Sequence, residues 1–196
     1  MIVKTTKDLL VESFRELAER QSIHKITIRD ITDNCKLSPA TFYRYFQNKF
    51  DLITWDYGNR MKEIMTLACD EGKSWSQLQL EYIRFYESHK SFFVNIIQHT
   101  RGYESFTRNM ADIGAQQIRY YLLEGRGLPR LDADMELYIR IYCHGATMTV
   151  CEWLFDAIDA TAEKLAVLLD NSLPLPLRES ILGERHGQKP LSNTHS

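Results

Sequence analysis

The chain has 196 residues, of which 44% are hydrophobic and 26% are charged, and its formal net charge is −2. This composition is ordinary for a folded protein with a core, in one large domain or two small ones. No apolar run reaches the ~18 residues that a membrane span needs, so we expect no membrane association. The near-neutral charge argues against a general nucleic-acid binder. Nine glycines, five prolines and few β-branched alternations indicate an all-α chain.

The charge is distributed unevenly along the chain. Residues 1–50 hold nine Lys and Arg against six Asp and Glu, a net charge of +3, while residues 51–196 hold fifteen against twenty, a net charge of −5. The sign of this difference fits a DNA-reading head on an acidic body, although a solvated face of mixed charge gives the same numbers.

The four cysteines, Cys35, Cys69, Cys143 and Cys151, form no C-x-x-C pair and have no metal-ligand spacing with histidine. We therefore expect no metal and no cofactor. Without a signal peptide, they are expected to be reduced thiols of a cytoplasmic protein. Cys143 and Cys151 are eight residues apart. Buried structural thiols are the ordinary interpretation of this pair, and redox sensing is the alternative.

The stretch 26–52 is the most informative part of the sequence, because it fits two short helices joined by a tight turn. Thr27 has the position of a helix cap, and Asp30 completes a capping box. Lys36 and Leu37 form the turn. Ser38 then caps a second helix, whose first position is a proline. A preceding helix, predicted from residue 5 or 6 to about residue 21, supplies an apolar stripe that packs against this pair.

The second short helix has a buried side and an exposed side. Phe42 and Phe46 lie one turn apart and are expected in the core. Thr41, Tyr43 and Arg44 point mostly away from that side. Hydroxyl and phenol groups donate hydrogen bonds to phosphate oxygens, and an arginine reads base edges. We therefore predict a helix-turn-helix.

The run T-x-R-D-I-x-x-x-x-x-L-S-x-x-T-F-Y-R-Y-F-x-N-K-x-D-L, which begins at Thr27, resembles the DNA-binding signature of the TetR family of transcriptional regulators. The aromatic string and the following lysine carry most of the resemblance. It implies an all-α protein with an N-terminal three-helix helix-turn-helix DNA-binding head, followed by a larger helical regulatory and dimerisation domain. We assign the head to residues 1–50, the body to residues 51–183, and a tail that we expect to be disordered to residues 184–196.

The same resemblance assigns residues of the motif to phosphates and to base edges. The chemistry agrees, because arginine binds guanine O6 and N7 bidentately and a small side chain contacts a thymine methyl group. The residues expected at phosphates are Thr27, Tyr43, Tyr45 and Lys49; those expected near bases are Arg29, Pro39, Ala40, Thr41 and Arg44, with Ser38 as the helix cap beside them.

Two positions depart from the family pattern. Thr32 stands where alanine is common, and Lys36 stands where glycine is common. If Lys36 adopts a left-handed conformation, it costs about 1 kcal/mol relative to glycine.

Caps, apolar spacing and Gly or Pro breaks predict the rest of the chain. Asn48 caps a long helix that leads from the head into the body and is the natural lever between them. The predicted helices cover residues 48–69, 74–89, 105–123, 132–156 and 161–171, with a further turn at 177–182 and an apolar stretch at 92–97.

Two sets of residues in the body are candidates for function. Aromatic residues of the middle helices are expected at the small-molecule pocket that the resemblance implies, although each is more commonly plain core. Stripes on the last two long helices are either core or, as the resemblance implies, the interface of a homodimer. The pocket candidates are Tyr82, Phe85, Tyr86, Phe93, Tyr103 and Tyr120; the interface candidates are Ala146, Val150, Trp153, Leu154, Leu165 and Leu169.

The resulting hypothesis is a cytoplasmic, homodimeric regulator that binds a palindromic operator in double-stranded DNA, as a repressor released by a small-molecule inducer. An activator whose C-terminal domain binds a partner protein is an alternative. The ending W-L-F-D-A-I with a short leucine-rich helix is loosely similar to activators of dihydroxyacetone kinase operons. A helical enzyme is the remote alternative. No catalytic residue is predicted, because no nucleophile–base or carboxylate pair has a recognised local signature.

Overall fold

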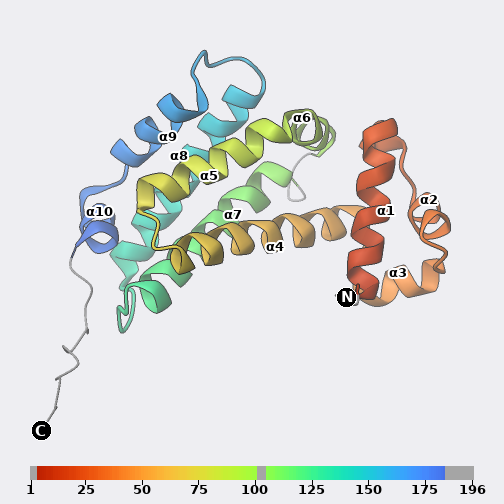
Figure 1. The fold of residues 1–196 in the computed structure, drawn as a ribbon, viewed down its shortest axis with the longest axis horizontal. Helices are drawn as coiled ribbons and strands as arrows, with labels where there is room; N and C mark the ends of the chain where they lie inside the picture. The colour runs from red at the N-terminus through yellow and green to blue at the C-terminus, as the bar shows by residue number, and fades with distance from the viewer. Residues whose placement is uncertain (1–3, 101–104, 184–196) are drawn as a thin grey trace, which may run out of the picture.

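A computed structural model describes residues 4–100 and 105–183 of the chain. All regular structure in these residues is helical, as predicted, with a small head at one end and a larger body at the other (Figure 1). The expected tail at 184–196 lies outside the described residues, as does Tyr103. The helices are α1 (Thr6–Arg20), η1 (Ile23–Lys25), α2 (Ile28–Asn34), α3 (Pro39–Tyr45), α4 (Lys49–Asp70), α5 (Trp75–Ser88), α6 (Lys90–His99), α7 (Phe106–Tyr120), η3 (Tyr121–Gly125), α8 (Ala133–Leu154), α9 (Ala162–Asn171) and α10 (Leu175–Leu182).

The head folds around a small apolar core. α1 contributes Leu10 and Phe14, α3 contributes Phe42, and all three side chains are almost completely buried. α1 packs against α2, and α2 packs against α3. Phe46, which follows α3, and Leu52 of α4 are buried in the same cluster. A head this small gains stability from that additional burial.

One helix connects the head to the body. The Asn48 side-chain oxygen accepts hydrogen bonds from the backbone N–H groups of Phe50 and Asp51 at 2.9 and 3.0 Å, which caps the start of α4 as predicted. α4 then continues to Asp70 in the body (Figure 1). A helix of 22 residues is about 33 Å long, so a shift of its body end is transmitted to the head.

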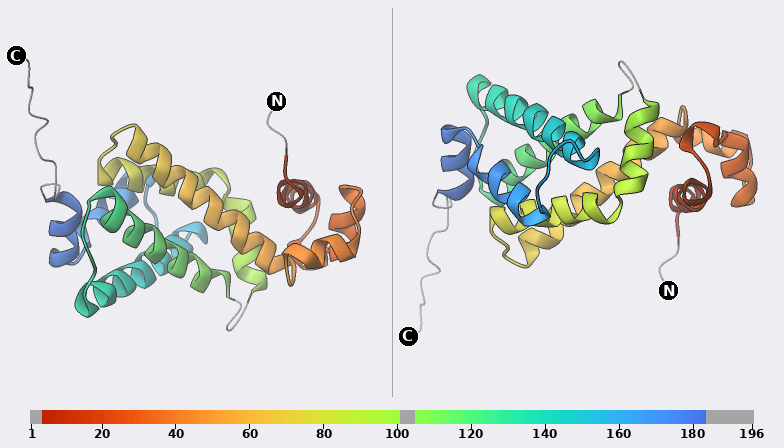
Figure 2. Two further views of the ribbon diagram at one scale, coloured as in Figure 1. Left: turned by 90° about the horizontal axis from the view of Figure 1, so that it is seen from below. Right: turned by 90° about the horizontal axis from the view of Figure 1, so that it is seen from above.

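The body is a bundle in which neighbouring helices pack in pairs. α7 packs against α8, α5 packs against α9, and α4 contacts both α5 and α7. α10 packs against α8. The turned views place α10 at the end of the body that lies away from the head (Figure 2). The middle of the bundle therefore lies between α4, α5, α7 and α8.

Most helix boundaries follow their local signals. Ser74, Asp132 and Thr161 cap α5, α8 and α9 through side-chain hydrogen bonds, where the sequence predicted these helices to begin. Two segments differ in detail. The apolar stretch 92–97 is part of a complete helix, α6, and the helix predicted to reach residue 123 changes at Tyr121 into the π-helix η3.

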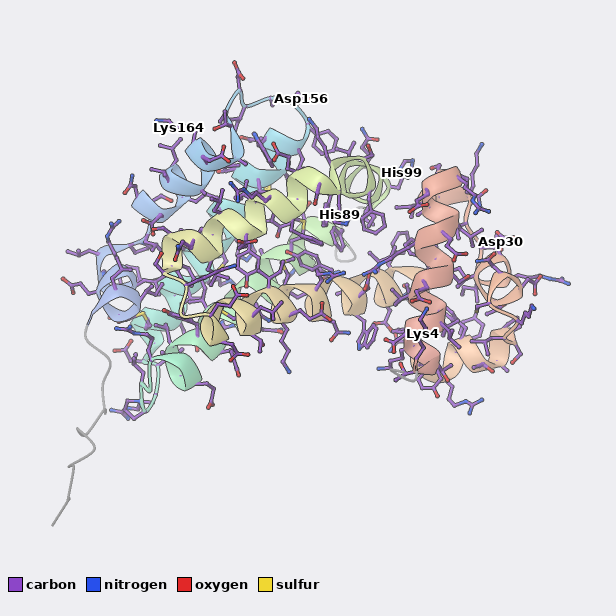
Figure 3. The ribbon with its side chains drawn as sticks, in the orientation of Figure 1. Lys4, Asp30, His89, His99, Asp156 and Lys164 are labelled. Atoms are coloured by element: carbon purple, nitrogen blue, oxygen red, sulfur yellow. The ribbon has the colours of Figure 1, made fainter. Side chains whose placement is uncertain are left out.

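Side chains of the head contact both α4 and α6. The rings of His24 in η1 and His99 in α6 stack with their centroids 5.8 Å apart. Figure 3 shows His99 at the side of the body that is nearest the head. Arg15 of α1 donates two hydrogen bonds to the carboxylate of Asp56 in α4, at 2.7 and 3.0 Å.

Candidate nucleic-acid interface and body cavity

We call α2, α3 and the turn between them the hook. Its first helix, α2, starts with a complete capping box. The Thr27 hydroxyl oxygen accepts a hydrogen bond from the Asp30 backbone N–H at 3.1 Å, and the Asp30 carboxylate accepts from the Thr27 backbone N–H and hydroxyl, both at 2.8 Å. The bond from the Thr27 backbone, with that from its hydroxyl, lowers the pKa of Asp30. Figure 3 shows Asp30 on the outer side of the head, away from the body. The capping box therefore fixes how α2 sits at the outer surface.

The turn of the hook uses a left-handed residue. Lys36 has a φ of 57°, and its N–H donates to the Asp33 carbonyl at 3.2 Å. The Leu37 N–H donates to the Thr32 carbonyl at 2.8 Å, which completes a Schellman arrangement. Lysine costs about 1 kcal/mol relative to glycine in this conformation, so the turn forms despite the departure from the family pattern. Thr32, the other departure, is fully buried, and its hydroxyl donates to the carbonyl of Arg29 at 3.1 Å.

The second helix of the hook, α3, presents polar and aromatic side chains to solvent. The Ser38 hydroxyl caps it by accepting a backbone N–H at 3.1 Å, and Pro39 occupies its first position. Phe42 is buried beneath the helix, whereas Tyr43 is 60% exposed and Tyr45 is 38% exposed. The Tyr43 ring meets the Phe42 ring edge-on at 5.7 Å. A large aromatic that is anchored at one edge and otherwise exposed is suited to contact with another surface.

The other residues expected at DNA also lie on the outside of the hook, with one exception. The Arg29 side chain is 84% exposed, and its Nε lies 3.5 Å from the Asp33 carboxylate. Such an exposed pair contributes little free energy, so the guanidinium is able to exchange its partner for a base or a phosphate. Ala40 and Arg44 are exposed, and Thr41 is partly exposed.

The exception is Lys49, whose ammonium is used inside the head. Its Nζ donates to the carbonyl oxygens of Ile23, His24 and Ile26 at 2.9, 3.1 and 2.7 Å. An ammonium has three N–H groups, and these bonds occupy all of them. Burial lowers the pKa of Lys49. The structure thus gives Lys49 a structural role, joining α4 to the segment before α2, in place of the phosphate contact expected from the resemblance.

Sequence reasoning missed a polar contact that holds α1 against α2. The Ser13 hydroxyl is buried and donates to the Ile31 carbonyl at 2.6 Å. The Asn34 side-chain amide donates to the Ser13 oxygen at 3.1 Å and to the Glu16 carboxylate at 3.0 Å. The only available signal was a serine within the apolar stripe of the first helix. This contact fixes the hook to α1.

The body contains a cavity of about 90 Å³ between α4, α5, α7, α8 and α9. Tyr82 and Tyr86, two of the expected pocket residues, line it. Phe85 and Phe93 instead border a separate hollow between α1, α4, α5 and α6. Tyr120 is exposed on α7 and lines neither of these two spaces. Its helix position turns it towards solvent.

Tyr57 of α4 connects the two spaces, because its side chain lines both of them. Its hydroxyl forms a hydrogen bond with the hydroxyl of Tyr86 in α5. Burial raises the pKa of both Tyr57 and Tyr86 well above the usual range, so both remain neutral phenols. The cavity is therefore in direct contact with the helix that carries the head.

The residues predicted for the subunit interface are not on the surface of α8 and α9, so the prediction was wrong for them. The stripe of α8 that the sequence singled out faces α7, and that of α9 faces α5. These side chains are consequently core within one chain and offer no surface to a second chain. Val150, Trp153, Leu154, Leu165 and Leu169 are buried, and Ala146 is partly buried and lines the cavity.

A different apolar face of the same two helices is exposed. On α8 the exposed residues recur at positions 137, 141, 148 and 155, which all lie on one side of a helix. Ile141 is 58% exposed in the middle of this stripe. The exposed apolar residues are Leu137, Ile141 and Met148 on α8, Phe155 at its C-cap, and Val167 and Leu168 on α9.

Two other kinds of site are not found in the part of the chain that the structure describes. Within residues 4–100 and 105–183, no group of three or more His, Cys, Asp or Glu side chains is placed to hold a metal ion. None of the helices described is long and apolar enough to cross a membrane.

Comparisons with known proteins agree with the geometry of the head. Residues 10–54 match the family model described as bacterial regulatory proteins, tetR family. Over 101 residues the chain is 27% identical to the HTH-type dhaKLM operon transcriptional activator DhaS of Lactococcus lactis subsp. lactis (strain IL1403). That match covers 52% of this chain and 54% of the relative, so it spans about half the length of the curated relative.

Solved structures show a similar arrangement of helices. The dihydroxyacetone kinase operon activator DhaS has a TM-score of 0.61, with 19% identity over 88% of this chain and 96% of that one. Thermus thermophilus FadR, a TetR family transcriptional repressor in complex with lauroyl-CoA, has a TM-score of 0.56, with 17% identity over 94% of this chain and 98% of that one. At these identities the likeness concerns the fold.

The three-helix head has the helix-turn-helix architecture that the sequence predicted, and a larger helical body follows it. The matched relatives are themselves transcription regulators. The head is thus similar, over residues 10–54, to the DNA-binding domain of the TetR family of bacterial regulatory proteins, as the motif implied.

Proposed function

We propose that the protein is a homodimer that binds a palindromic operator in double-stranded DNA with α3 of each subunit in the major groove. The observation that carries this proposal is the exposed side of the hook, where Tyr43 and Arg44 stand in solvent while Phe42 beneath them is buried. A helix in the major groove reads base edges with the residues near its start and is positioned by phosphate contacts on either side.

The proposed contacts divide by chemistry. Arg29, Pro39 and Ala40 lie near the base edges, because a guanidinium pairs with guanine and the small side chains allow close approach. Tyr43 and Tyr45 contact phosphates through their hydroxyl groups. The remaining proposed contacts are Thr27, Ser38, Thr41 and Arg44; Lys49 is omitted because its N–H groups are used within the head.

The exposed apolar residues of α8, with Val167 and Leu168 of α9, support the dimer. Several exposed apolar side chains on one face of a helix are unfavourable in water and are typical of an interaction surface. Ile141 lies at its centre, and Leu137 and Met148 flank it. A two-fold axis through this surface gives each dimer two heads, and the two heads bind two half-sites. Binding of the first head raises the effective concentration of the second.

We further propose repression that is released by a small molecule bound in the body cavity. Tyr57, Met61 and Met65 of α4 form part of the cavity wall, so an occupant contacts the same helix that positions the head. A ligand changes operator affinity only if it binds the DNA-competent and DNA-incompetent shapes differently. A small shift of α4 changes the spacing of the two heads relative to successive major grooves. The regulator acts in the cytoplasm, where it meets the chromosome.

An activator is the second candidate, and a specific observation favours it. The curated relative of this chain and one of the solved structures with its fold are both named as activators of a dihydroxyacetone kinase operon. In that case the body binds a partner protein. Deleting the gene and measuring transcription from the promoter that the protein occupies separates the two. Transcription rises if the protein represses and falls if it activates.

Mapping the genomic sites that the protein occupies tests the core of the proposal. We expect a small set of promoter sites that share a palindrome with half-sites about one turn of DNA, or a multiple of it, apart. Binding that is spread evenly over the chromosome, with no shared sequence, would contradict it.

A further inference from the structure

Two buried polar atoms in the walls of the body cavity have no partner. The indole N–H of Trp75 in α5 is a donor without an acceptor, and the side-chain carbonyl oxygen of Gln117 in α7 is an acceptor without a donor. Trp75 is only 2% exposed. Buried polar groups are nearly always hydrogen-bonded, and an orphan costs free energy. One donor and one acceptor in the same cavity therefore indicate a ligand that supplies the opposite pair.

The cavity wall carries no formal charge. Its lining consists of apolar, aromatic, thiol, hydroxyl and amide side chains, and none of the described residues that line it is Asp, Glu, Lys, Arg or His. An ionised group placed there would lose its hydration without gaining a counter-charge, which is very unfavourable. The occupant is consequently neutral in the part that the cavity holds.

The size of the cavity limits the occupant further. Its volume is about 90 Å³, whereas a cavity that holds benzene measures about 150 Å³. Met61, Met65 and Met110 lie in its wall. Methionine side chains have three rotatable bonds and adapt to an occupant. A single six-membered ring is therefore accommodated by a modest movement of these side chains, while a long acyl chain requires the bundle to repack.

We propose that the effector is a compact neutral molecule, about the size of one substituted ring, that bears one hydroxyl or carboxamide group. A hydroxyl or a carboxamide both accepts and donates a hydrogen bond, so such a group offers the acceptor that the Trp75 N–H lacks and the donor that the Gln117 oxygen lacks. This inference rests on the proposed control by a small molecule, and it specifies the chemistry of that molecule.

Two matched pairs of probes test the chemistry. Phenol and toluene have nearly the same shape, but only phenol carries the hydrogen-bonding group. Benzamide and benzoate also match in shape, but only benzoate is charged at neutral pH. Binding to the full-length protein is measured by titration calorimetry. The variant Trp75→Phe is measured in the same way, because it removes the indole N–H from the cavity wall. We expect phenol and benzamide to bind and benzoate to bind at least about 10-fold more weakly than benzamide.

The variant Gln117→Leu removes the acceptor at nearly constant volume, and Gln116→Leu makes the same change on the exposed neighbour. We expect Gln117→Leu to reduce the preference for phenol over toluene by about 3- to 10-fold, which corresponds to one net hydrogen bond. Gln116→Leu should leave this preference unchanged. Circular dichroism melting of both variants confirms that each one is folded.

Operator binding measured on the same preparations separates this inference from the proposed function. If the protein binds its operator but takes up neither phenol nor benzamide, or binds benzoate as well as benzamide, the inference is overturned and the DNA-binding role stands. An unchanged phenol preference in Gln117→Leu would overturn it equally. A protein that binds the neutral probes but no DNA would contradict the proposed function instead.

Discussion

The ammonium of Lys49 lies 2.7 Å from the carbonyl oxygen of Ile26 and donates a hydrogen bond to it. Lys49 begins α4, the lever, and Ile26 stands just before the capped start of α2. The same ammonium also bonds the carbonyls of Ile23 and His24. The first turn of the lever is thus fastened directly to the segment that carries the hook, so the two move together.

Replacing this ammonium should destabilise the head. In Lys49→Met three carbonyl groups lose their donor, and we expect the free energy of unfolding to fall by about 1–3 kcal/mol. Lys25→Met changes an exposed lysine of the same head. Its free energy of unfolding should lie within about 0.5 kcal/mol of the wild-type value. Urea denaturation followed by fluorescence measures both.

The same variant tests whether Lys49 contacts phosphate. A lysine that neutralises a phosphate contributes about one unit to the slope of log K against log salt. We expect Lys49→Met to leave this slope unchanged at temperatures where the variant is folded. A slope flatter by one unit would show that the ammonium leaves its three carbonyls on binding.

Substitutions on the two helices of the hook should have different signatures. Tyr43→Phe removes a proposed phosphate contact and should weaken binding to operator and random duplex alike. Arg29→Ala should instead relax the preference at one or two base pairs, by about 1–3 kcal/mol for a lost bidentate contact. Competition titrations against single-base operator variants distinguish them. Equal weakening of operator and random DNA by Arg29→Ala would remove its base-reading role.

The Arg15–Asp56 pair makes the stability of the head contact depend on pH. Burial raises the pKa of Asp56, and the neighbouring Arg15 opposes that rise. The folded state therefore keeps the Asp56 proton to a higher pH than the unfolded state does, and stability falls as pH increases between the two pKa values. In Arg15→Met the carboxylate loses its partner, so the pKa rises further.

We expect Arg15→Met to lower the free energy of unfolding at pH 7 by about 1–3 kcal/mol, and we expect this deficit to shrink as the pH falls towards 4. Arg84→Met breaks an exposed pair with Glu163, 54% and 60% exposed, and should have little effect at any pH. Thermal melts across the pH range compare the two variants. A deficit that is constant with pH would show that Arg15 acts through packing alone.

The exposed stripe of α8 should determine the oligomeric state. Ile141→Glu places a charge at the centre of the apolar face and should convert the protein to monomers, because burying an unpaired charge is costly. Leu67→Glu changes an equally exposed leucine on α4 and should leave the dimer intact. Light scattering after size-exclusion chromatography gives the mass of each. A monomeric wild type would contradict the proposed interface.

The two buried thiols of α8 should be unreactive in the folded protein. Burial raises the pKa of Cys143 to about 12 and also raises that of Cys151, so neither forms much of the thiolate that reacts. We expect iodoacetamide at pH 8 to label them only after unfolding, as judged by mass spectrometry of the peptides. Rapid labelling of either one in the native protein would favour the redox-sensing alternative.

Local chemistry made the head predictable from sequence. The caps at Thr27 and Ser38, the left-handed turn at Lys36 and the burial of Phe42 all depend on residues within a few positions of one another. Such short-range signals are visible in a single sequence.

Tertiary partners were not predictable in the same way. Periodicity showed that α8 has an apolar side, but only the packing of α7 shows that the side with Val150 is internal and the side with Ile141 is external. The carbonyl partners of Lys49 lie more than twenty residues away, and the cavity is assembled from five helices. No local pattern encodes these relationships.

We propose, above all, that the exposed hook of each subunit of a pair binds duplex DNA. The most direct test is selection from a randomised duplex library on the purified protein at low salt, followed by fluorescence anisotropy with the selected duplex. We predict a palindromic sequence that binds two subunits per duplex and loses its advantage over random DNA in Arg29→Ala. A wild-type protein that retains no duplex from the library would contradict the claim.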